Sequence, residues 1–393
     1  MEKKVHDAVK RIRKSFQSGV VNAGDDSRIV KCMRRALAGE KLTVAFLGGS
    51  ITQGSLASNP QLCYAYQTYA WWERAFPKAV ISYWNAGIGG TTSHLGVARV
   101  QEEVMSQMPD FIITEFSVND EDESLHFKET YESLVRRILT TPWKPALMLV
   151  QNVRYDDGGN AEKIHQPIAE RYRIPCVSMK PVLYSKVADG SLDRRAITPD
   201  DLHPNDLGHE LVAGVIISYL EQAKKKAEAL GPDPYCGGEG DEDDSFLPLP
   251  IPLTRSGYEN VERRRNYQIV PYEKQGFHKD ETPQLSISDC FKRGWTAKEL
   301  GAKISFKVQG ENIAVQYRKT VRKPAPIATL YLDGDHQHGI LLDSNFTQDW
   351  GDLLYLETVL EHGNPGEHTV EIEITTATEA DAECFYLVSL ITG

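Results

Sequence analysis

The sequence lacks the features that would place the chain in a membrane or build it around cysteine. It has no apolar run of about 18 residues, the length that a membrane-spanning helix needs. Its N-terminus, MEKKVHDAVKRIRKSF, has no apolar segment of the kind that a secretory signal requires. Its 6 cysteines form no CxxC pair, which argues against a metal site or a disulfide scaffold. These absences favour a reducing cytoplasm, with no membrane partner and no metal.

Charge and composition narrow the class of protein further. Asp and Glu number 55 against 44 Lys and Arg, and the formal net charge is −11. A nucleic-acid partner needs a basic face, so this balance argues against one. Hydrophobic residues make up 41% and charged residues 25% of the chain, as in ordinary globular proteins. A chain of 393 residues predicts two or three domains.

Residues 1–230 alternate short apolar runs with stretches of helical period. A helix is expected to end at Pro109, and a last helix to begin near Pro204. Nearly continuous apolar runs are typical of parallel strands that are covered on both faces. The pattern therefore predicts an α/β domain, with a parallel sheet between two helical layers. The predicted strands are residues 43–47, 79–84, 111–118, 146–153 and 175–179.

The pattern changes twice after residue 230. Residues 231–264 are the predicted linker or long loop, because Gly, Pro and acidic residues dominate its first part. The acidic run DEDD at 241–244 could bind calcium, but like-charge blocks are more often solvated. Residues 265–393 show apolar alternation with period two, as in ISFKV at 304–308, between Gly-rich turns. This alternation predicts an antiparallel β-sandwich.

The stretch LGGSITQG, residues 47–54, follows the first predicted strand and has three interpretations. It could cradle a phosphate, carry a catalytic serine or form a plain tight turn. The phosphate interpretation fails, because the stretch lacks the lysine of a P-loop and the glycine spacing of a dinucleotide site. By itself, Gly-Gly-Ser is more often a strand-to-helix turn than a nucleophile. The residues at the other strand ends therefore distinguish a catalytic serine from a plain turn, because ligand sites of open α/β sheets lie at the carboxyl ends of strands.

Those strand ends carry groups that suit acyl transfer. Ser50 needs a base within hydrogen-bond reach, and His203, oriented by Asp200 three residues earlier, could serve. The backbone N–H of Ser50, a glycine N–H of the segment NAGIGGTTS (85–93) and the Asn119 amide could bind the oxyanion.

Each group also has a simpler explanation. The pair Asn119-Asp120 after a strand is usually a helix cap or an Asx-turn. A single histidine such as His203 more often belongs to a loop or a core. The groups occur together and in order, each at a predicted strand end or just before the last helix. This coincidence favours an active site over four unrelated turns.

The four segments resemble the conserved blocks of the SGNH (GDSL-type) hydrolase family over residues 40–225. GGSIT resembles the block of the nucleophile Ser50, and NAGIGG resembles the block whose last glycine, Gly90, binds the oxyanion. SVND resembles the block that supplies Asn119, and DDLHPN resembles the block of the acid Asp200 and the base His203. The resemblance implies a flavodoxin-like three-layer domain that needs no cofactor.

The chain departs from the family pattern at two places. No aspartate precedes Ser50, and Ser117 stands where glycine is usual in the third block. Asp201 lies beside Asp200, so two carboxylates are candidates for orienting His203, and the spacing favours Asp200.

The second domain bears on the substrate. A jelly-roll-like sandwich beside an SGNH domain resembles a carbohydrate-binding module, as in bacterial two-domain esterases that deacetylate mannan or xylan oligosaccharides. This resemblance implies that Trp350 stacks on a sugar while Gln348 or Asp349 binds its hydroxyls. Packing of Trp350 in the sandwich core is an equal alternative. Tyr64, on the helix after Ser50, is a further candidate for substrate contact, although aromatic residues on helices usually belong to a core.

We therefore expect a cytoplasmic serine esterase whose partner is an acetylated oligosaccharide, with mannan favoured over xylan. One alternative is a lipase or thioesterase of the same fold, and another is a non-catalytic glycan-binding protein. The stretch SLASNPQLCYAY after Ser50 is small and polar, which suits a sugar better than an acyl chain. Homo-oligomer formation is left open.

Overall fold

The computed structural model describes residues 2–235 and 246–393. The chain divides into two compact units, Met1–Glu259 and Asn260–Gly393. The acidic run at 241–244, with its candidate calcium site, lies outside the described residues. None of the described helices combines the length and the apolar character that crossing a bilayer requires.

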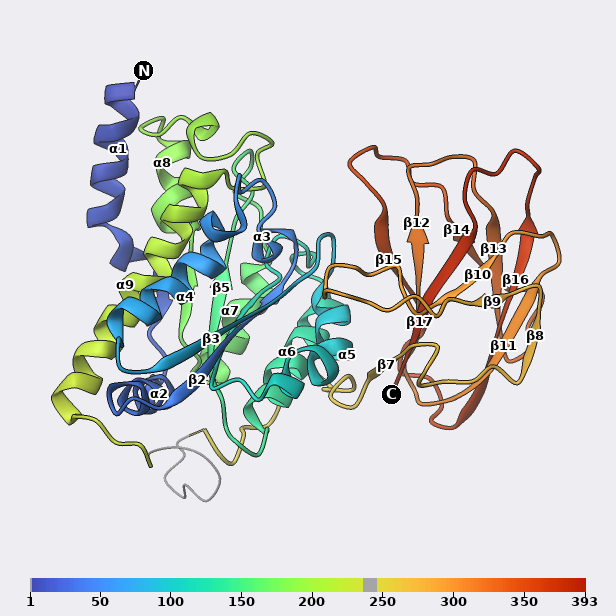
Figure 1. Ribbon diagram of the computed structural model, residues 1–393, viewed down its shortest axis with the longest axis horizontal. Helices are drawn as coiled ribbons and strands as arrows, with labels where there is room; N and C mark the ends of the chain where they lie inside the picture. The colour runs from blue at the N-terminus through green and yellow to red at the C-terminus, as the bar shows by residue number, and fades with distance from the viewer. Residues whose placement is uncertain (1, 236–245) are drawn as a thin grey trace. The chain divides into compact units, whose positions relative to one another are not determined.

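The first unit is built on a six-stranded sheet with the strand order β1-β6-β5-β4-β2-β3 (Figure 1). The strands β2 to β6 run parallel to one another, and all five were predicted from the apolar runs. Counted along the chain, these five strands lie in the order 2-1-3-4-5, which is the flavodoxin order. The bounds are β1 Val20–Asn22, β2 Lys41–Gly48, β3 Val80–Gly87, β4 Phe111–Glu115, β5 Ala146–Gln151 and β6 Cys176–Ser178.

The sheet departs from the prediction at one edge. Strand β1 pairs with β6 in the antiparallel sense, whereas a wholly parallel sheet was expected. This strand has only three residues, and all are half-buried. A three-residue edge strand is too short to produce a periodic signal, so the sequence could not reveal it.

Helices cover both faces of the sheet, which confirms the three-layer fold (Figure 1). Helices α2, α4 and α9 pack together on one face, and α5, α6 and α7 pack together on the other. Aromatic pairs join the sheet to α4, as when the Phe46 and Tyr64 rings meet edge to face at 6.1 Å. The helices are α1 Glu2–Lys14, α2 Ser27–Leu37, α3 Ser50–Gln53, α4 Tyr64–Ala75, α5 Ser93–Glu103, α6 Leu125–Leu139, α7 Glu162–Arg171, α8 Ser185–Ala188 and α9 Asp206–Leu230.

The predicted last helix is confirmed, with a defined start. The side chain of Asn205 accepts a hydrogen bond from the backbone N–H of Gly208 at 3.0 Å and caps α9. The preceding loop, which carries Asp200 and His203, is therefore joined to a helix that packs on the sheet.

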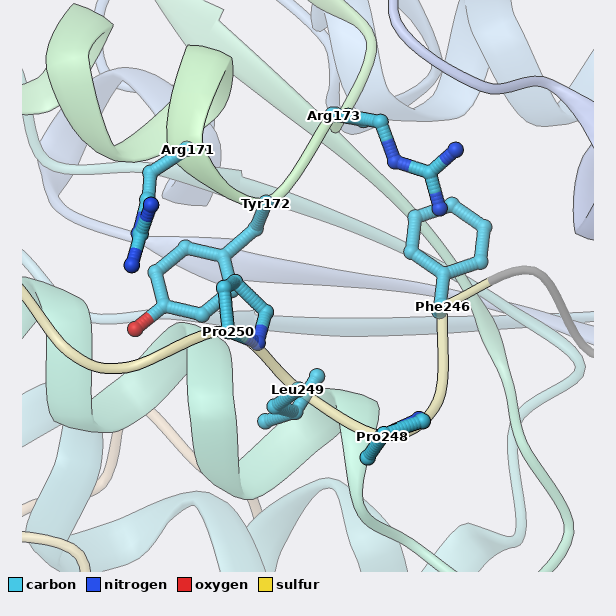
Figure 2. A pocket seen from close by; sticks show the side chains of 7 residues that line it. All are labelled: Arg171, Tyr172, Arg173, Phe246, Pro248, Leu249 and Pro250. Atoms are coloured by element: carbon cyan, nitrogen blue, oxygen red, sulfur yellow. The ribbon is translucent and has the colours of Figure 1, made fainter.

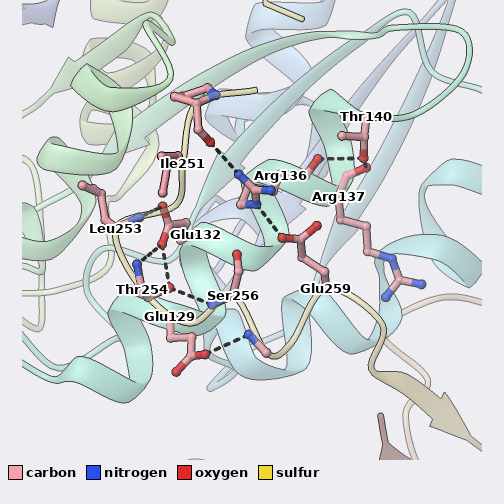
Figure 3. A network of polar contacts seen from close by, with 12 residues as sticks. Glu129, Glu132, Arg136, Arg137, Thr140, Ile251, Leu253, Thr254, Ser256 and Glu259 are labelled. Carbon is pink, nitrogen blue, oxygen red and sulfur yellow. Dashed lines mark hydrogen bonds and ion pairs between the residues drawn. The ribbon is translucent and has the colours of Figure 1, made fainter. Parts of the chain in front are cut away.

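Residues 250–258, which we call the strap, lie along α6 within the first unit (Figure 3). The carboxylate of Glu132 on α6 is fully buried beneath the strap. One of its oxygens accepts the backbone N–H of Leu253 at 2.7 Å. The other accepts the N–H and the hydroxyl of Thr254 at 2.7 and 2.6 Å. This part of the predicted linker at 231–264 is therefore held against a helix by charge-assisted hydrogen bonds.

The second unit consists of two antiparallel sheets, as the alternation predicted (Figure 1). One sheet has the order β15-β12-β17-β10-β9, with β7 also paired to β17, and the other has the order β14-β13-β16-β11-β8. The strands are β7 Glu262–Arg264, β8 Glu273–Gln275, β9 His278–Lys279, β10 Trp295–Ala297, β11 Lys303–Gln309, β12 Ile313–Lys319, β13 Ile327–Leu332, β14 Ile340–Asp343, β15 Leu353–Leu360, β16 Glu367–Thr376 and β17 Phe385–Thr392.

The register of the strands explains the alternating sequence. In the β11–β16 pair, Ile304 lies opposite Ile372 and Phe306 lies opposite Val370. All four side chains are buried in the sandwich core. Side chains of alternate residues point to the same face of a strand, so one apolar face per sheet builds this core.

Candidate active site

The candidate site lies where the order of the parallel strands reverses. Strands β2, β3 and β4 are neighbours and end at the same edge of the sheet. The turns after them are joined, since the N–H of Ile88 donates to Gly48 O at 3.0 Å and the N–H of Gly49 donates to Glu115 O at 3.3 Å. In doubly wound sheets, ligands bind at this switch point.

The glycines before Ser50 let the end of β2 approach its neighbours closely. A Cβ at Gly48 would lie 2.4 Å from the backbone oxygen of Glu115. A Cβ at Gly49 would lie 2.4 Å from Oδ1 of Asn119. Ser50 then begins α3, which is capped by Gly54 with a φ of 101°, a left-handed conformation that favours glycine. The small residues therefore let the turn before Ser50 approach the side chain of Asn119.

The structure brings Ser50, His203 and Asp200 into one hydrogen-bonded series. Nε2 of His203 lies 2.8 Å from Oγ of Ser50, and Nδ1 lies 2.7 Å from Oδ2 of Asp200. A carboxylate can only accept, so Nδ1 carries the ring proton and Nε2 of the neutral ring is left to accept from the serine hydroxyl. This is the arrangement that a base needs to activate a serine.

The Asp200 carboxylate is well suited to remain charged. Its Oδ1 accepts the backbone N–H groups of Leu202 at 3.0 Å and His203 at 2.7 Å. Burial alone would raise the pKa of Asp200, but the hydrogen bonds from His203 and Leu202 outweigh it and lower the pKa below its ordinary value. Asp200 therefore faces the imidazole as an anion at neutral pH.

The neighbouring carboxylate has other partners. Asp201 forms ion pairs with Arg194 at 3.1 Å and with Arg195 at 2.8 Å. The geometry thus favours Asp200, as the spacing predicted, as the carboxylate that orients His203.

The three residues predicted to bind an oxyanion follow the ends of β2, β3 and β4. Ser50 is the first residue of α3, where a backbone N–H has no partner within the helix. Gly90 follows β3, is exposed and has a φ of 70°, which glycine adopts without strain. Asn119 follows β4 and is half-buried, with its amide against Gly49. The donors therefore come from three adjacent strand ends, although their roles stay predictions.

A buried acid that the sequence did not reveal lies beneath this edge. Glu115, the last residue of β4, is fully buried, and burial raises its pKa to about 7 although hydrogen bonds from Ser117 oppose the shift. Its Oε1 accepts the N–H of Ser117 at 3.0 Å and the hydroxyl of Ser117 at 2.8 Å. The serine that stands in place of the usual glycine therefore partners a buried carboxyl group.

Tyr64 does not fit the predicted contact with substrate. Its side chain is 0% exposed, and its hydroxyl lies 2.8 Å from Oγ1 of Thr52. Tyr64 packs between the sheet and α9, with its ring stacked over His209 at 6.4 Å. The structure corrects this prediction, because a fully buried ring supports α3 from below and offers no surface to a sugar.

The candidate residues of the second unit are exposed. Trp350 is 56% exposed and Gln348 and Asp349 are exposed as well, so the alternative that Trp350 packs in the sandwich core is wrong. The Trp350 ring packs edge to face on Phe346 at 5.1 Å, and its indole N–H donates to the amide oxygen of Gln348. An exposed ring that its neighbours hold in place can stack on a ligand, and this role stays a prediction.

A separate cavity of about 230 Å³ lies at the end of α7 (Figure 2). It contains none of the residues of the candidate site. Both arginines of the cavity have partners, since Arg171 donates to the backbone oxygen of Ile251 at 2.7 Å and Arg173 forms an ion pair with Asp25 at 3.5 Å. Its lining residues are Arg171, Tyr172, Arg173, Phe246, Pro248, Leu249 and Pro250.

Known proteins resemble this chain over nearly its whole length. The model of the GDSL-like Lipase/Acylhydrolase family matches residues 46–211. Two crystal structures of a two-domain esterase (CEX) active on acetylated mannans, one of them co-crystallised with mannopentaose, are 49% identical to this chain. Each has a TM-score of 0.88, and the match covers 96% of this chain and 97% or 98% of theirs. No match was found among curated proteins.

Proposed function

Because this chain belongs to the GDSL-like Lipase/Acylhydrolase family, we propose that it is a serine esterase that removes O-acetyl groups from oligosaccharides of plant polysaccharides. Acetylated mannan is the favoured substrate, with xylan next. The observation that carries the proposal is the series Ser50–His203–Asp200, with its two hydrogen bonds of 2.8 and 2.7 Å. The likeness to an esterase active on acetylated mannans supports the choice of substrate.

The first half of the proposed reaction forms an acetyl-enzyme. Oγ of Ser50 attacks the carbonyl carbon of the acetyl group while Nε2 of His203 takes the serine proton. Asp200 holds the ring in the required tautomer and stabilises the imidazolium that forms. The carbonyl oxygen becomes an oxyanion, which the N–H groups of Ser50 and Gly90 and the Asn119 amide bind. The bond to the sugar oxygen then breaks, and His203 returns the proton to the leaving hydroxyl.

The second half hydrolyses the acetyl-enzyme. His203 takes a proton from water, and the resulting hydroxide attacks the acetyl carbonyl carbon. The same donors hold the second oxyanion. The bond between the acetyl carbon and Oγ of Ser50 breaks, the serine regains a proton from His203, and acetate leaves. The chain's own residues perform every proton transfer of this sequence.

The proposal predicts a strong preference for short acyl groups. An acetyl ester should be the best of a series of esters with increasing acyl length, because the segment SLASNPQLCYAY after Ser50 is small and polar. A lipase would instead gain about 0.8 kcal/mol for every methylene that it buries. Rates should be measured on such a series, together with acetate release from a panel of acetylated mannan and xylan oligosaccharides. A maximum at a medium-length or long acyl chain would favour the lipase, and glycan binding without ester hydrolysis would favour a binding protein.

The second unit is proposed to contribute a sugar-binding surface. Trp350 would stack on a sugar ring while Gln348 and Asp349 bind hydroxyl groups, since an exposed aromatic ring with polar neighbours suits a carbohydrate. Homo-oligomer formation and the cytoplasmic location remain predictions.

Trp350→Ala should raise KM for an acetylated mannooligosaccharide by about tenfold, the equivalent of about 1.4 kcal/mol of binding. A small chromogenic acetyl ester, which cannot span a sugar-binding surface, should be hydrolysed at the unchanged rate. Tyr272→Ala is the matched control, because Tyr272 is a similarly exposed aromatic residue of the second unit outside this loop. Equal losses on both substrates, or no loss on the oligosaccharide, would contradict a role of Trp350 in sugar binding.

A further inference from the structure

The loop that carries Gly90 is held on both sides by side chains with no role in the proposed reaction. We propose that Gln53 and Asp120 are positioning residues that clamp residues 89–93 and thereby preset the oxyanion-binding site. This inference rests on the proposed function and deepens it. The clamp joins the three strand ends that supply the oxyanion donors.

Gln53 holds the first end of the loop. It is the last residue of α3, three positions after Ser50, and its Oε1 accepts the backbone N–H of Gly89 at 2.7 Å. A backbone N–H can only donate, so the amide oxygen must face Gly89 and the orientation of the amide is fixed. A Cβ at Gly89 would lie 3.7 Å from Cβ of Ser50. The hydrogen bond therefore ties the residue before Gly90 to the turn that carries the nucleophile.

Asp120 holds the other end of the loop. It follows Asn119 directly, and its side chain is 0% exposed. Its Oδ1 accepts the backbone N–H of Ser93, the first residue of α5, at 2.8 Å. Its Oδ2 lies 3.0 Å from Nε2 of the buried His165. Both oxygens are engaged, so the carboxylate joins the turn of Asn119 to the end of the Gly90 loop in a single orientation.

His165 makes this second contact rigid. The residue lies on α7, and its ring stacks on Tyr131 of α6 with the centroids 3.6 Å apart and the planes 15° apart. Two helices that pack on the sheet therefore set the position of Asp120. The clamp is thus supported by the fold and not by the loop itself.

The segment between the two holding points has little intrinsic rigidity. Gly90 has a φ of 70°, and glycine is the residue with the widest range of backbone conformations. A donor stabilises an oxyanion well only when its position is fixed before the reaction, because reorientation during the reaction costs free energy. Holding Gly89 and Ser93 limits the directions in which the Gly90 N–H can point. The effect of the clamp should therefore appear in the transition state more than in substrate binding.

Gln53→Met removes the acceptor and keeps the length of the side chain. It should lower kcat about 10- to 100-fold, because removal of a single oxyanion donor costs about 10²- to 10³-fold and the clamp acts only through a donor. KM should change less than about twofold, since the interaction belongs to the transition state. Affinity for a boronic acid that mimics the tetrahedral intermediate should fall by the same factor as kcat/KM. Asp120→Asn should likewise lower kcat and the affinity for the boronic acid.

The double variant should lose less than the product of the two single losses, because both residues hold one loop. Gln107→Met is the control for Gln53, since Gln107 is exposed near the start of β4. Asp110→Asn is the control for Asp120, because Asp110 likewise accepts a backbone N–H, that of Thr43 at 2.8 Å, at the opposite edge of the sheet. Both controls should keep kcat and the boronic acid affinity.

An unchanged kcat in Gln53→Met, a rise in KM alone, or equal losses in the control variants would overturn the clamp. If Asp120→Asn fails to fold, the kcat of Gln53→Met alone tests the clamp, because Gln53 is exposed. Ser50→Ala distinguishes a failure of the proposed esterase function from a failure of the clamp. If that variant stays active, the proposed function fails. If it is inactive while Gln53→Met is fully active, only the clamp fails.

Discussion

Ser50→Ala is expected to lower kcat/KM for a chromogenic acetyl ester by about 10⁴- to 10⁶-fold, while the fold is retained. The hydroxyl is the atom that bonds to the acetyl carbon, and its loss leaves only the oxyanion donors to accelerate attack by water. The methyl group of alanine fits where the serine side chain lies, because Ser50 is nearly buried at 8% exposure. The rate of acetate release and the thermal unfolding midpoint should be measured on the same preparation.

Ser55→Ala is the matched control for this variant. Ser55 lies five residues further along the chain, and its backbone N–H donates to Ser50 O at 3.0 Å through an atom that the substitution does not change. This control should keep the activity of the unaltered protein. If Ser50→Ala remained active, or if both variants lost activity equally, Ser50 would not be the nucleophile.

Asp200→Asn should lower kcat about 10³- to 10⁴-fold with little change in KM. The asparagine amide can present its NH₂ group to Nδ1 of His203, which would favour the tautomer that carries its proton on Nε2. That tautomer cannot accept the proton of Ser50. The pH dependence of kcat and single-turnover acetate release would show whether formation of the acetyl-enzyme is the step that slows.

Asp201→Asn provides the comparison within the same loop. Its carboxylate pairs with Arg194 and Arg195 and not with the imidazole, so this substitution should leave kcat within about twofold of the unaltered value. If Asp201→Asn were the more damaging of the two variants, the assignment of the orienting carboxylate would be wrong.

The architecture of the first unit could be predicted because each central strand carries a nearly continuous apolar run. The β2 segment KLTVAFLG is buried over its last five residues, as a strand covered on both faces must be. The positions of Ser50, Asn119 and His203 follow from this, since each lies directly after a predicted strand or before a predicted helix. The ends of adjacent parallel strands meet at one edge, whatever the details of packing.

Contacts between residues far apart in the chain could not be predicted. His165 and Asp120 are 45 positions apart, and no spacing rule connects a helix residue with the turn after another strand.

The prediction for Tyr64 was wrong for a different reason. Its sequence position near Ser50 suggested a contact with substrate, but the face of α4 that it occupies is turned toward the sheet. A single aromatic residue does not reveal which face of a helix it occupies.

The strap determines the shortest N-terminal fragment of this chain that we expect to fold by itself. A shortened chain that ended with α9 at Leu230 would keep Ser50, Asp200 and His203 but would remove Leu253 and Thr254. Glu132 would then retain the hydroxyl of Tyr172, at 2.6 Å, and lose the three donors of the strap. Water would have to replace these donors, and wherever the carboxylate stayed buried without them the cost would be about 1–3 kcal/mol or more. The first unit should therefore be separated from the second only after Glu259, because the strap that follows α9 belongs to the packing of α6.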